Sequence, residues 1–438
     1  MYSDKDLNDY LEAAMSKDEY VSDYKRLLDE CVKRKFLYKG KPIPFEYQPL
    51  LISDKDEEAF KRIAKETMSI VKKVTEKYVE DESYRKLFGY DDFVEKLILH
   101  EPGYDMPVPM ARFDVFYNGY EDFGFCEINT DGTSAMLEDY AIASLLLESK
   151  IFEDLNWNFS RYELFDTWVK KIISLYSDIK GERPKTVLIA DFNDTGTPDE
   201  FLMFKEHFAN NGVKCIIEDI SNLDYNEDKN RLIAKGEEID LVYRRVVMSD
   251  LVRRKDDSNA FIEAYLNDAA VYVGSFRSQV VHNKVFFSVA HMDETKEFLT
   301  DEENEFVKKH IPFTARFEGD EAFFNKIVKN KDKYIFKPTD LNAARGVYTG
   351  RSMSEDEFIK TAKENFNTDY IYQEFVTPKE LPFLKLDGDK FSLIKRRNMI
   401  GLFCYMEEFS GVYARMGLHD IIGSAMEYVA ATGIKYER

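Results

Sequence analysis

The sequence predicts a mixed α/β (α+β) protein with more than one domain. Its 438 residues exceed what a single hydrophobic core usually serves, and 44% of them are hydrophobic, which is enough for several cores. The first hundred residues have the apolar spacing of helices, whereas residues 185–247 alternate between strand and helix patterns. We therefore expect a helical N-terminal region, a small parallel α/β domain and further strands around them.

The composition argues against several functional classes. Asp and Glu number 82 against 61 Lys and Arg, which gives a net charge of −21 and disfavours a broad nucleic-acid surface. The longest apolar run, residues 140–147, is too short to span a membrane, and the first residues are polar, unlike a secretory signal. The four cysteines form no CxxC pair. We expect a cytoplasmic monomer or homodimer that binds neither nucleic acid nor membranes.

Two helices are predicted in the N-terminal region, 1–107. Ser16 and Glu19 form a capping-box pattern and predict a helix that begins there. After Ser53, apolar residues keep helical spacing for about five turns. Both apolar stripes indicate packing, and strand-like runs begin only at Val108.

Residues 185–247 have the pattern of a separate α/β unit. Strands are expected at 186–190, 214–220 and 239–247, with an amphipathic helix at 201–208. Strand, helix and strand at this spacing are typical of a parallel sheet.

A predicted hairpin carries the most informative polar residues. The runs around Arg112 and Glu127 alternate apolar and polar residues, and the connection contains the turn dipeptide Asn-Gly. A tight turn and a longer loop give different pairings, but both place Arg112, Asp114, Glu127 and Asn129 on one face. In the longer-loop pairing, Asp114 lies opposite Glu127 and Arg112 opposite Asn129.

Two carboxylates that face each other across a strand pair repel, so a cation is expected between them. Asp114 and Glu127, with the amide oxygen of Asn129, make a hard oxygen set suited to Mg²⁺ that also binds phosphate. The alternative is a solvated face on which Arg112 pairs with Asp114. The donor-rich loop that follows, which contains Asp131, Thr133 and Ser134, favours the metal interpretation.

These motifs resemble those of a known family. E-x-N-x-x-G, from Glu127 to Gly132, with R-x-D upstream, is similar to the metal-binding strands of the circularly permuted ATP-grasp ligases, which include glutathionylspermidine synthase and eukaryotic glutathione synthetase. The resemblance implies ATP and Mg²⁺ as cofactors, with Asp114, Glu127 and Asn129 as metal ligands. It also implies that the ATP-binding half lies downstream.

Matching elements follow in the downstream half. A hydrophobic strand ends in Lys337-Pro338, and Arg345 and Gly346 follow at the position of the family's phosphate loop, which usually carries more glycine. Lys284 resembles the family's other ATP-contacting lysine. The family's hinge strand, whose backbone binds adenine, resembles the segment formed by Gln373, Glu374, Phe375 and Val376.

Arginines provide the remaining expected site residues. Arg415, in a G-x-x-x-R pattern, and Arg112 are implied as the catalytic cations. Asp131, Thr133, Ser134, Arg244 and Arg245 are implied on the substrate side. Because adjacent strand residues point to opposite faces, at most one of Arg244 and Arg245 is expected to enter the cleft.

The order of these motifs predicts an ATP-grasp-like fold with permuted topology. The expected divisions are metal-binding strands at 108–165, an inserted α/β domain of the preATP-grasp type at 166–282 and the ATP-binding portion at 283–438. The sequence lacks the P-loop, H-E-x-x-H, G-x-S-x-G and kinase H-R-D signatures. The expected activity is a C–N ligase that joins a peptide or amino-acid carboxylate to an amine through an acyl phosphate. The alternatives are a nucleotide-binding module without ligase activity and a small-molecule kinase.

Overall fold

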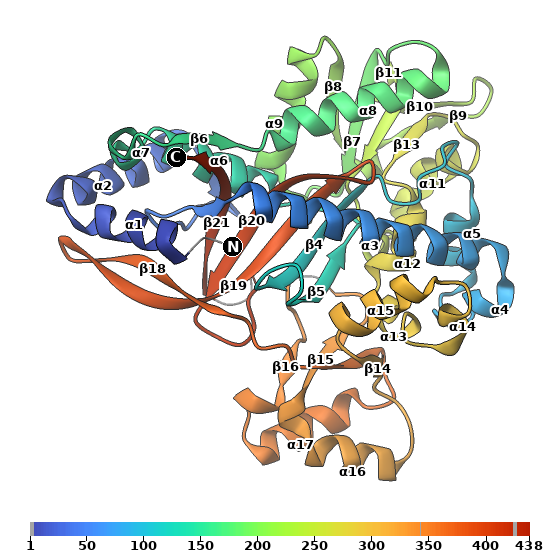
Figure 1. Cartoon of the computed structure of the whole chain (residues 1–438). Helices are drawn as coiled ribbons and strands as arrows, with labels where there is room; N and C mark the ends of the chain where they lie inside the picture. Colours follow the sequence, from blue (N-terminus) through green and yellow to red (C-terminus); the bar gives the residue numbers. More distant parts are fainter. Residues whose placement is uncertain (1–3, 342, 424–426) are drawn as a thin grey trace.

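A computed structural model describes residues 4–341, 343–423 and 427–438 (Figure 1). Its principal sheet has the strand order β3-β21-β20-β19-β4-β5, with β18 paired to β19 and β6 paired to β21. Thus strands from the early and the late parts of the chain lie side by side in it, as the permuted topology requires. The strands of this sheet are β3 (Leu50–Ile52), β4 (Met110–Tyr117), β5 (Phe123–Asn129), β6 (Asn158–Arg161), β18 (Glu380–Asp387), β19 (Lys390–Tyr405), β20 (Glu408–Gly417) and β21 (Tyr428–Glu437).

Helix α3 (Asp54–Glu80) lies across one face of this sheet (Figure 1). It begins at a complete capping box, in which Ser53 and Asp56 bond each other's backbone N–H groups. Its buried stripe includes Phe60, whose ring meets Tyr117 at a centroid distance of 4.9 Å and Phe409 at 5.7 Å. The apolar periodicity after Ser53 therefore did predict a packing helix.

The remaining N-terminal elements show two differences from expectation. Helix α2 begins at Asp18 with no side-chain cap, and the Ser16 hydroxyl instead donates to the carbonyl of Ala13, so the predicted capping box is wrong. Short strands also occur in the region expected to be helical. Their apolar runs are too short for periodicity to distinguish from helix, and β3 pairs with β21 from the far end of the chain. These elements are α1 (Asp4–Met15), α2 (Asp18–Lys33), β1 (Leu37–Tyr38), β2 (Lys41–Pro42), α4 (Glu82–Arg85) and α5 (Asp92–Leu99). Helices α6 (Met136–Leu147) and α7 (Lys150–Leu155) follow the hairpin of β4 and β5.

The predicted parallel α/β unit is confirmed. Its strands run parallel in the order β13-β12-β7-β8, with helices packed around them (Figure 1). The sequence pattern did not identify β13, which is only three residues long. The elements are α8 (Leu164–Lys180), β7 (Thr186–Asp191), α9 (Pro198–Asn210), β8 (Lys214–Asp219), β9 (Asp224–Asn226), β10 (Arg231–Ala234), β11 (Glu237–Glu238), β12 (Leu241–Arg244), α10 (Met248–Arg253), α11 (Asn259–Leu266) and β13 (Val271–Val273).

A smaller lobe, at the bottom of Figure 1, has its own sheet in the order β14-β17-β15-β16. Its separate core includes Phe317, Phe324, Phe336 and Phe358. Residues 283–438 therefore contribute both to this lobe and, through β19–β21, to the principal sheet. The elements are α12 (Gln279–His282), α13 (Val285–Val289), α14 (Asp293–Lys296), α15 (Asp301–His310), β14 (Thr314–Arg316), α16 (Glu321–Lys329), β15 (Tyr334–Pro338), β16 (Tyr348–Thr349), α17 (Glu355–Asn365) and β17 (Tyr370–Glu374).

Among the described residues, no helix combines the length and the apolar character needed to cross a bilayer.

Candidate active site

The hairpin of β4 and β5 adopts the longer-loop pairing near its polar residues. Asp114 lies opposite Glu127 and Arg112 opposite Asn129, but the register shifts beyond Asp114, where Val115 pairs with Phe125. The shift leaves Cys126 as the extra residue of a β-bulge. Its carbonyl accepts a hydrogen bond of 2.8 Å from Lys337 Nζ.

Arg112 and Asp114 form a buried bidentate ion pair. Arg112 Nε lies 2.6 Å from Asp114 Oδ1 and Nη2 lies 2.8 Å from Oδ2, while Nη1 donates to the carbonyl of Ser134 at 2.7 Å. Asn129 Nδ2 donates to Asp114 Oδ2 at 3.2 Å and to Glu127 Oε1 at 3.3 Å. The two carboxylates thus converge on one amide, and the pairing of Arg112 with Asp114 that the sequence left as an alternative is present.

Gly401 makes room for this ion pair, and sequence reasoning missed it. It lies opposite Asp114 on β19, and a Cβ atom there would approach Arg112 Cδ to 2.7 Å and Asp114 Oδ1 to 3.0 Å. A glycine within a strand often marks such a close approach, which is the signal that could have identified it.

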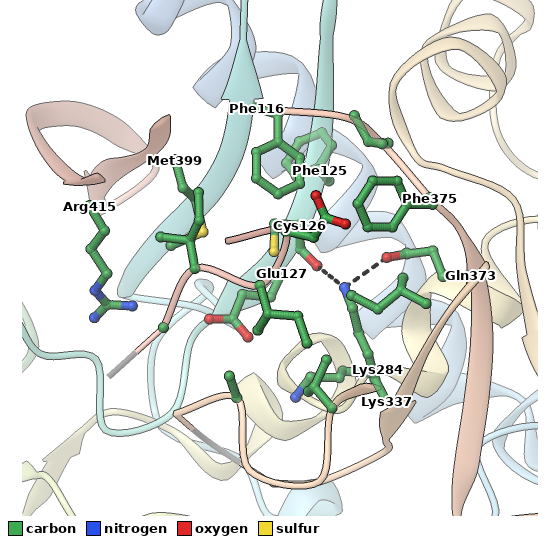
Figure 2. Close-up of a pocket in the computed structure, with 18 of the residues that line it drawn as sticks. Phe116, Phe125, Cys126, Glu127, Lys284, Lys337, Gln373, Phe375, Met399 and Arg415 are labelled. Carbon is green, nitrogen blue, oxygen red and sulfur yellow. Dashed lines mark hydrogen bonds between the residues drawn. The ribbon is translucent and has the colours of Figure 1, made fainter. Parts of the chain in front are cut away.

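A cavity between the principal sheet and the small lobe contains the predicted ATP-binding lysines (Figure 2). Lys337 Nζ donates to the carbonyl of Cys126 and to Gln373 Oε1, both at 2.8 Å, and Lys284 Nζ donates to the carbonyl of Leu341 at 2.9 Å. Glu127 lines the same cavity, and the charges of both lysines act on it. Thus three side chains predicted from separate motifs meet in one space.

The charges in this cavity support one another. Burial alone would raise the pKa of Glu127, but the positive charges of Lys284, Arg112, Lys337 and Arg415 outweigh it and lower the pKa to about 2. Burial lowers the pKa of Lys284, and Glu127 opposes that effect. Glu127 is therefore ionised at neutral pH within a strongly cationic site.

The hinge segment lines the cavity through Gln373, Glu374, Phe375 and Val376. The N–H of Glu374 already bonds the carbonyl of Phe313, and that of Phe375 bonds the carbonyl of Lys333. Among the described residues, the Val376 N–H has no backbone partner, so it is available to a ligand in the cavity. Apolar residues that sequence reasoning missed complete the wall: Phe116, Phe125, Ile335, Val347, Met399 and Ile422.

The loop after Lys337 reaches the cavity through different residues from those predicted. Ala343 and Ala344 line it, whereas Arg345 and Gly346 are exposed and lie outside the lining. Ala343 and Ala344 have φ angles of 64° and 59°, a left-handed conformation that costs an alanine about 1 kcal/mol. The backbone thus adopts a conformation suited to glycine at positions where the sequence has alanine.

Asp131 and Arg244 form a buried ion pair on the other side of the hairpin. The Arg244 guanidinium contacts Asp131 Oδ1, and Asp131 Oδ2 accepts from the N–H of Met248 at 2.6 Å. Neither side chain lines the cavity, so their assignment as substrate contacts stays a prediction.

Arg245 joins the same loop to helix α9. It donates to Glu200 Oε1 at 3.0 Å and to the carbonyl of Thr133, and the Thr133 hydroxyl donates to the carbonyl of Asn129 at 2.9 Å. Ser134 contributes its carbonyl to Arg112. Both adjacent arginines are thus buried with acidic partners, and the loop after Asn129 is fixed to the α/β unit.

Arg415 lies in β20 and lines the cavity. Its guanidinium carbon lies 5.5 Å from the ring centroid of Tyr413 and 5.9 Å from that of Tyr428. No acidic group of the described residues lies within ion-pair distance, so Arg415 is a cation available to an anionic ligand.

The three predicted metal ligands, Asp114, Glu127 and Asn129, fit Mg²⁺ only if phosphate oxygens complete its coordination. Within the described ranges, no cluster of three His, Cys, Asp or Glu side chains is arranged to hold a metal ion, and both oxygens of Asp114 face Arg112. Glu127 retains a free coordination direction, and a rotation of the Asn129 amide would present its oxygen. Mg²⁺ is commonly held by one or two carboxylates and substrate phosphates, which this donor set permits.

Comparison with known proteins places the chain in a family. No curated protein sequence matches it. A glutathione synthetase-like effector from Globodera pallida matches with a TM-score of 0.63 at 13% identity, covering 94% of this chain and 96% of that one. A RimK domain ATP-grasp protein from Sphaerobacter thermophilus aligns with a TM-score of 0.27 at 13% identity, covering 56% of this chain and 90% of that one.

The likeness to the glutathione synthetase-like effector and a match to a preATP-grasp family model agree with the predicted ATP-grasp-like fold. Residues 39–304 match the family described as glutathionylspermidine synthase preATP-grasp, a span of more than half of the sequence. The chain belongs to the glutathionylspermidine synthase preATP-grasp family.

Proposed function

We propose that the protein is an ATP- and Mg²⁺-dependent ligase that joins a carboxylate to an amine through an acyl phosphate. The observation that most supports this function is the convergence of Lys284, Lys337, Arg415 and Glu127 on one cavity. That cavity combines an apolar end beside the hinge with a cationic end beside the Asp114–Asn129 set, as a nucleoside triphosphate requires.

The apolar end takes the adenine. Its edge meets the free N–H of Val376, and its faces pack against residues such as Phe375 and Met399. Lys337 and Lys284 then hold the phosphates by charge and hydrogen bonding, since each lysine has a donor in the cavity. Asp114, Glu127 and Asn129 would hold Mg²⁺, which would neutralise charge on the phosphates.

Phosphoryl transfer follows from positioning. A carboxylate is ionised at neutral pH, so no base is needed before its oxygen attacks the γ-phosphorus and the bond to the bridging oxygen breaks, releasing ADP. Arg415 and the guanidinium of Arg112 stabilise the negative charge on the transferred group. The amine nitrogen then attacks the acyl carbon, the C–O bond breaks, phosphate leaves, and the nitrogen loses its proton to give the amide.

The family suggests the substrate class. We infer a peptide or amino-acid carboxylate resembling that of glutathione, with an amine or polyamine as acceptor. A net charge of −21 is compatible with cationic acceptors.

The left-handed alanines favour one rival function. A phosphate loop with Ala343 and Ala344 in strained conformations is also compatible with a module that binds nucleotide but does not transfer phosphate. A small-molecule kinase is the other rival.

An acyl-phosphate trap distinguishes these functions. The protein is incubated with ATP, Mg²⁺ and a panel of acids that includes glutathione, with either hydroxylamine or spermidine as the amine. A ligase gives acid-dependent hydroxamate or amide, seen by mass spectrometry, and ADP in equal amount. Nucleotide binding without products supports the module, and ADP formation that needs no amine supports the kinase.

A further inference from the structure

Polar side chains continue along the same sheet face beyond Arg415. Tyr413 and Arg415 are two residues apart on β20, so they point to the same face. Tyr428 reaches this face from β21, where it pairs with Gly417. In the strand order of the sheet, β21 lies on the opposite side of β20 from Glu127, so this group extends the site away from the nucleotide end.

The start of helix α6 covers this face and is held in place. The Thr432 hydroxyl, on the residue paired with Tyr413, donates to Asp139 Oδ1 at 2.7 Å. The N–H groups of Met136 and Leu137 donate to Glu200 Oε2 at 2.9 and 3.3 Å. The first turn of α6 is thus fixed on both sides of Glu138.

Glu138 is a buried carboxylate without a cationic partner. It is 4% exposed, and apart from its own backbone N–H no group of the described residues donates a hydrogen bond or an ion pair to it. Tyr413 is buried on the same face, and its ring centroid lies 5.5 Å from the guanidinium carbon of Arg415. Burying a carboxylate without a cationic partner is costly, which indicates that a ligand supplies what Glu138 lacks.

The surrounding charges define that ligand. Arg415 and Arg112 are close enough to act electrostatically on Glu138, and so is the carboxylate of Glu200 on α9. Burial first, and then the charge of Glu200, raise the pKa of Glu138 to about 7, with Arg415 opposing. A further positive group beside Glu138 would favour its ionised form. The rings of Tyr413 and Tyr428 also offer faces on which a cation binds.

We propose that Glu138 binds the ammonium group of the amine substrate, beside Arg415 and on the side away from the nucleotide. The ligand class is a primary alkyl amine or polyamine, and this proposal rests on the ligase function proposed above. With the acyl phosphate held at Arg415, an amine at Glu138 is next to the acyl carbon that it attacks. On this proposal, the anion-binding Arg415 and the cation-binding Glu138 hold the two substrates where they react.

The test uses spermidine and the full-length protein. Binding is measured by titration calorimetry at 0.15 M salt, with Mg²⁺ and a non-hydrolysable ATP analogue present, to screen non-specific attraction. Glu138→Gln removes the charge with nearly the same shape, and Glu138→Asp keeps the charge on a shorter side chain. Glu302→Gln removes the same charge from an exposed position on α15 and serves as the matched control.

We expect Glu138→Gln to weaken spermidine binding about tenfold or more, because an ion-paired hydrogen bond is lost. Glu138→Asp should lose less of the affinity for spermidine, and Glu302→Gln should bind spermidine as tightly as the wild type does. Equal binding by wild type and Glu138→Gln, equal losses in Glu138→Gln and Glu302→Gln, or no binding by the wild type would each overturn the proposal. If the trap assay gives no acid-dependent product while Glu138→Gln still loses spermidine, only the ligase function fails.

Discussion

The substitution Glu138→Gln should stabilise the protein in a pH-dependent manner. Glu138 has an ordinary pKa of 4.5, and burial, reinforced by Glu200, raises it to about 7 in the folded protein. Below pH 4.5 the carboxyl group is protonated in both the folded and the unfolded chain, so it adds no penalty. As the pH rises from 4.5 through 7, the unfolded chain ionises first and the wild-type protein loses stability.

The size of this effect follows from the two pKa values. At about 1.4 kcal/mol for each pKa unit, the rise from 4.5 to about 7 corresponds to roughly 3 kcal/mol at pH 8. Glutamine carries no charge, so Glu138→Gln should be more stable than the wild type by an amount that grows from near zero at pH 4.5 toward this value. Arg415 and Arg112, which also act on Glu138, are present in both proteins, so their effect largely cancels in the difference. The charge of Glu138 also raises the pKa of Asp139, so its removal adds to the gain in the same direction.

Urea unfolding of the two proteins at pH 5 and pH 8, followed by circular dichroism, measures this difference. Glu302→Gln, at an exposed position, should show no such pH-dependent gain. A Glu138→Gln protein that is less stable than the wild type at pH 8, or equally different at both pH values, would refute the reasoning. Either outcome would mean that the carboxylate has a stabilising partner in the folded protein.

Other substitutions test the nucleotide end of the site. Lys337→Met should weaken ATP binding about tenfold to a hundredfold, because a charged donor is lost. Lys326→Met, on the exposed face of the same lobe, should leave ATP binding unchanged. If calorimetry gives Lys337→Met the same affinity for ATP as the wild type, Lys337 does not bind the nucleotide. Gly401→Ala should lower kcat about a hundredfold, because the added methyl displaces the Arg112–Asp114 pair; an unchanged kcat would contradict the close approach. Arg112→Ala should lower kcat more than it weakens ATP binding, and unchanged turnover would count against its catalytic role.

Sequence reasoning identified much of the site because its residues occur in short local patterns. Strand alternation placed Arg112, Asp114, Glu127 and Asn129 on one face, and this pairing is confirmed. Strand alternation did not predict the β-bulge at Cys126, because one extra residue in a strand does not show in the sequence pattern around it. The bulge matters because it directs a backbone carbonyl to Lys337.

The rest of the site depends on contacts between distant segments. Phe116, Met399 and Ile422 meet in one cavity although nothing in their local sequence links them. Arg244 ends strand β12 and Arg245 follows it, and alternation predicted that at most one would enter the cleft. Their acidic partners come from a loop and from α9, which only the tertiary structure brings near.

The fold shows the same limit. The parallel unit was predictable because strand and helix patterns alternate along the chain, whereas β3 joins the principal sheet through a strand at the opposite end of the sequence. Likewise, the alanines at 343 and 344 adopt left-handed angles that the sequence pattern assigns to glycine.

Transfer of labelled oxygen tests the central claim most directly. An acid that reacts in the trap assay is labelled with ¹⁸O in its carboxylate and converted to the amide with ATP, Mg²⁺ and spermidine. Attack by the carboxylate on the γ-phosphate would leave one labelled oxygen in each phosphate released, as seen by mass spectrometry. Amide formed together with unlabelled phosphate would contradict an acyl phosphate made in this cavity.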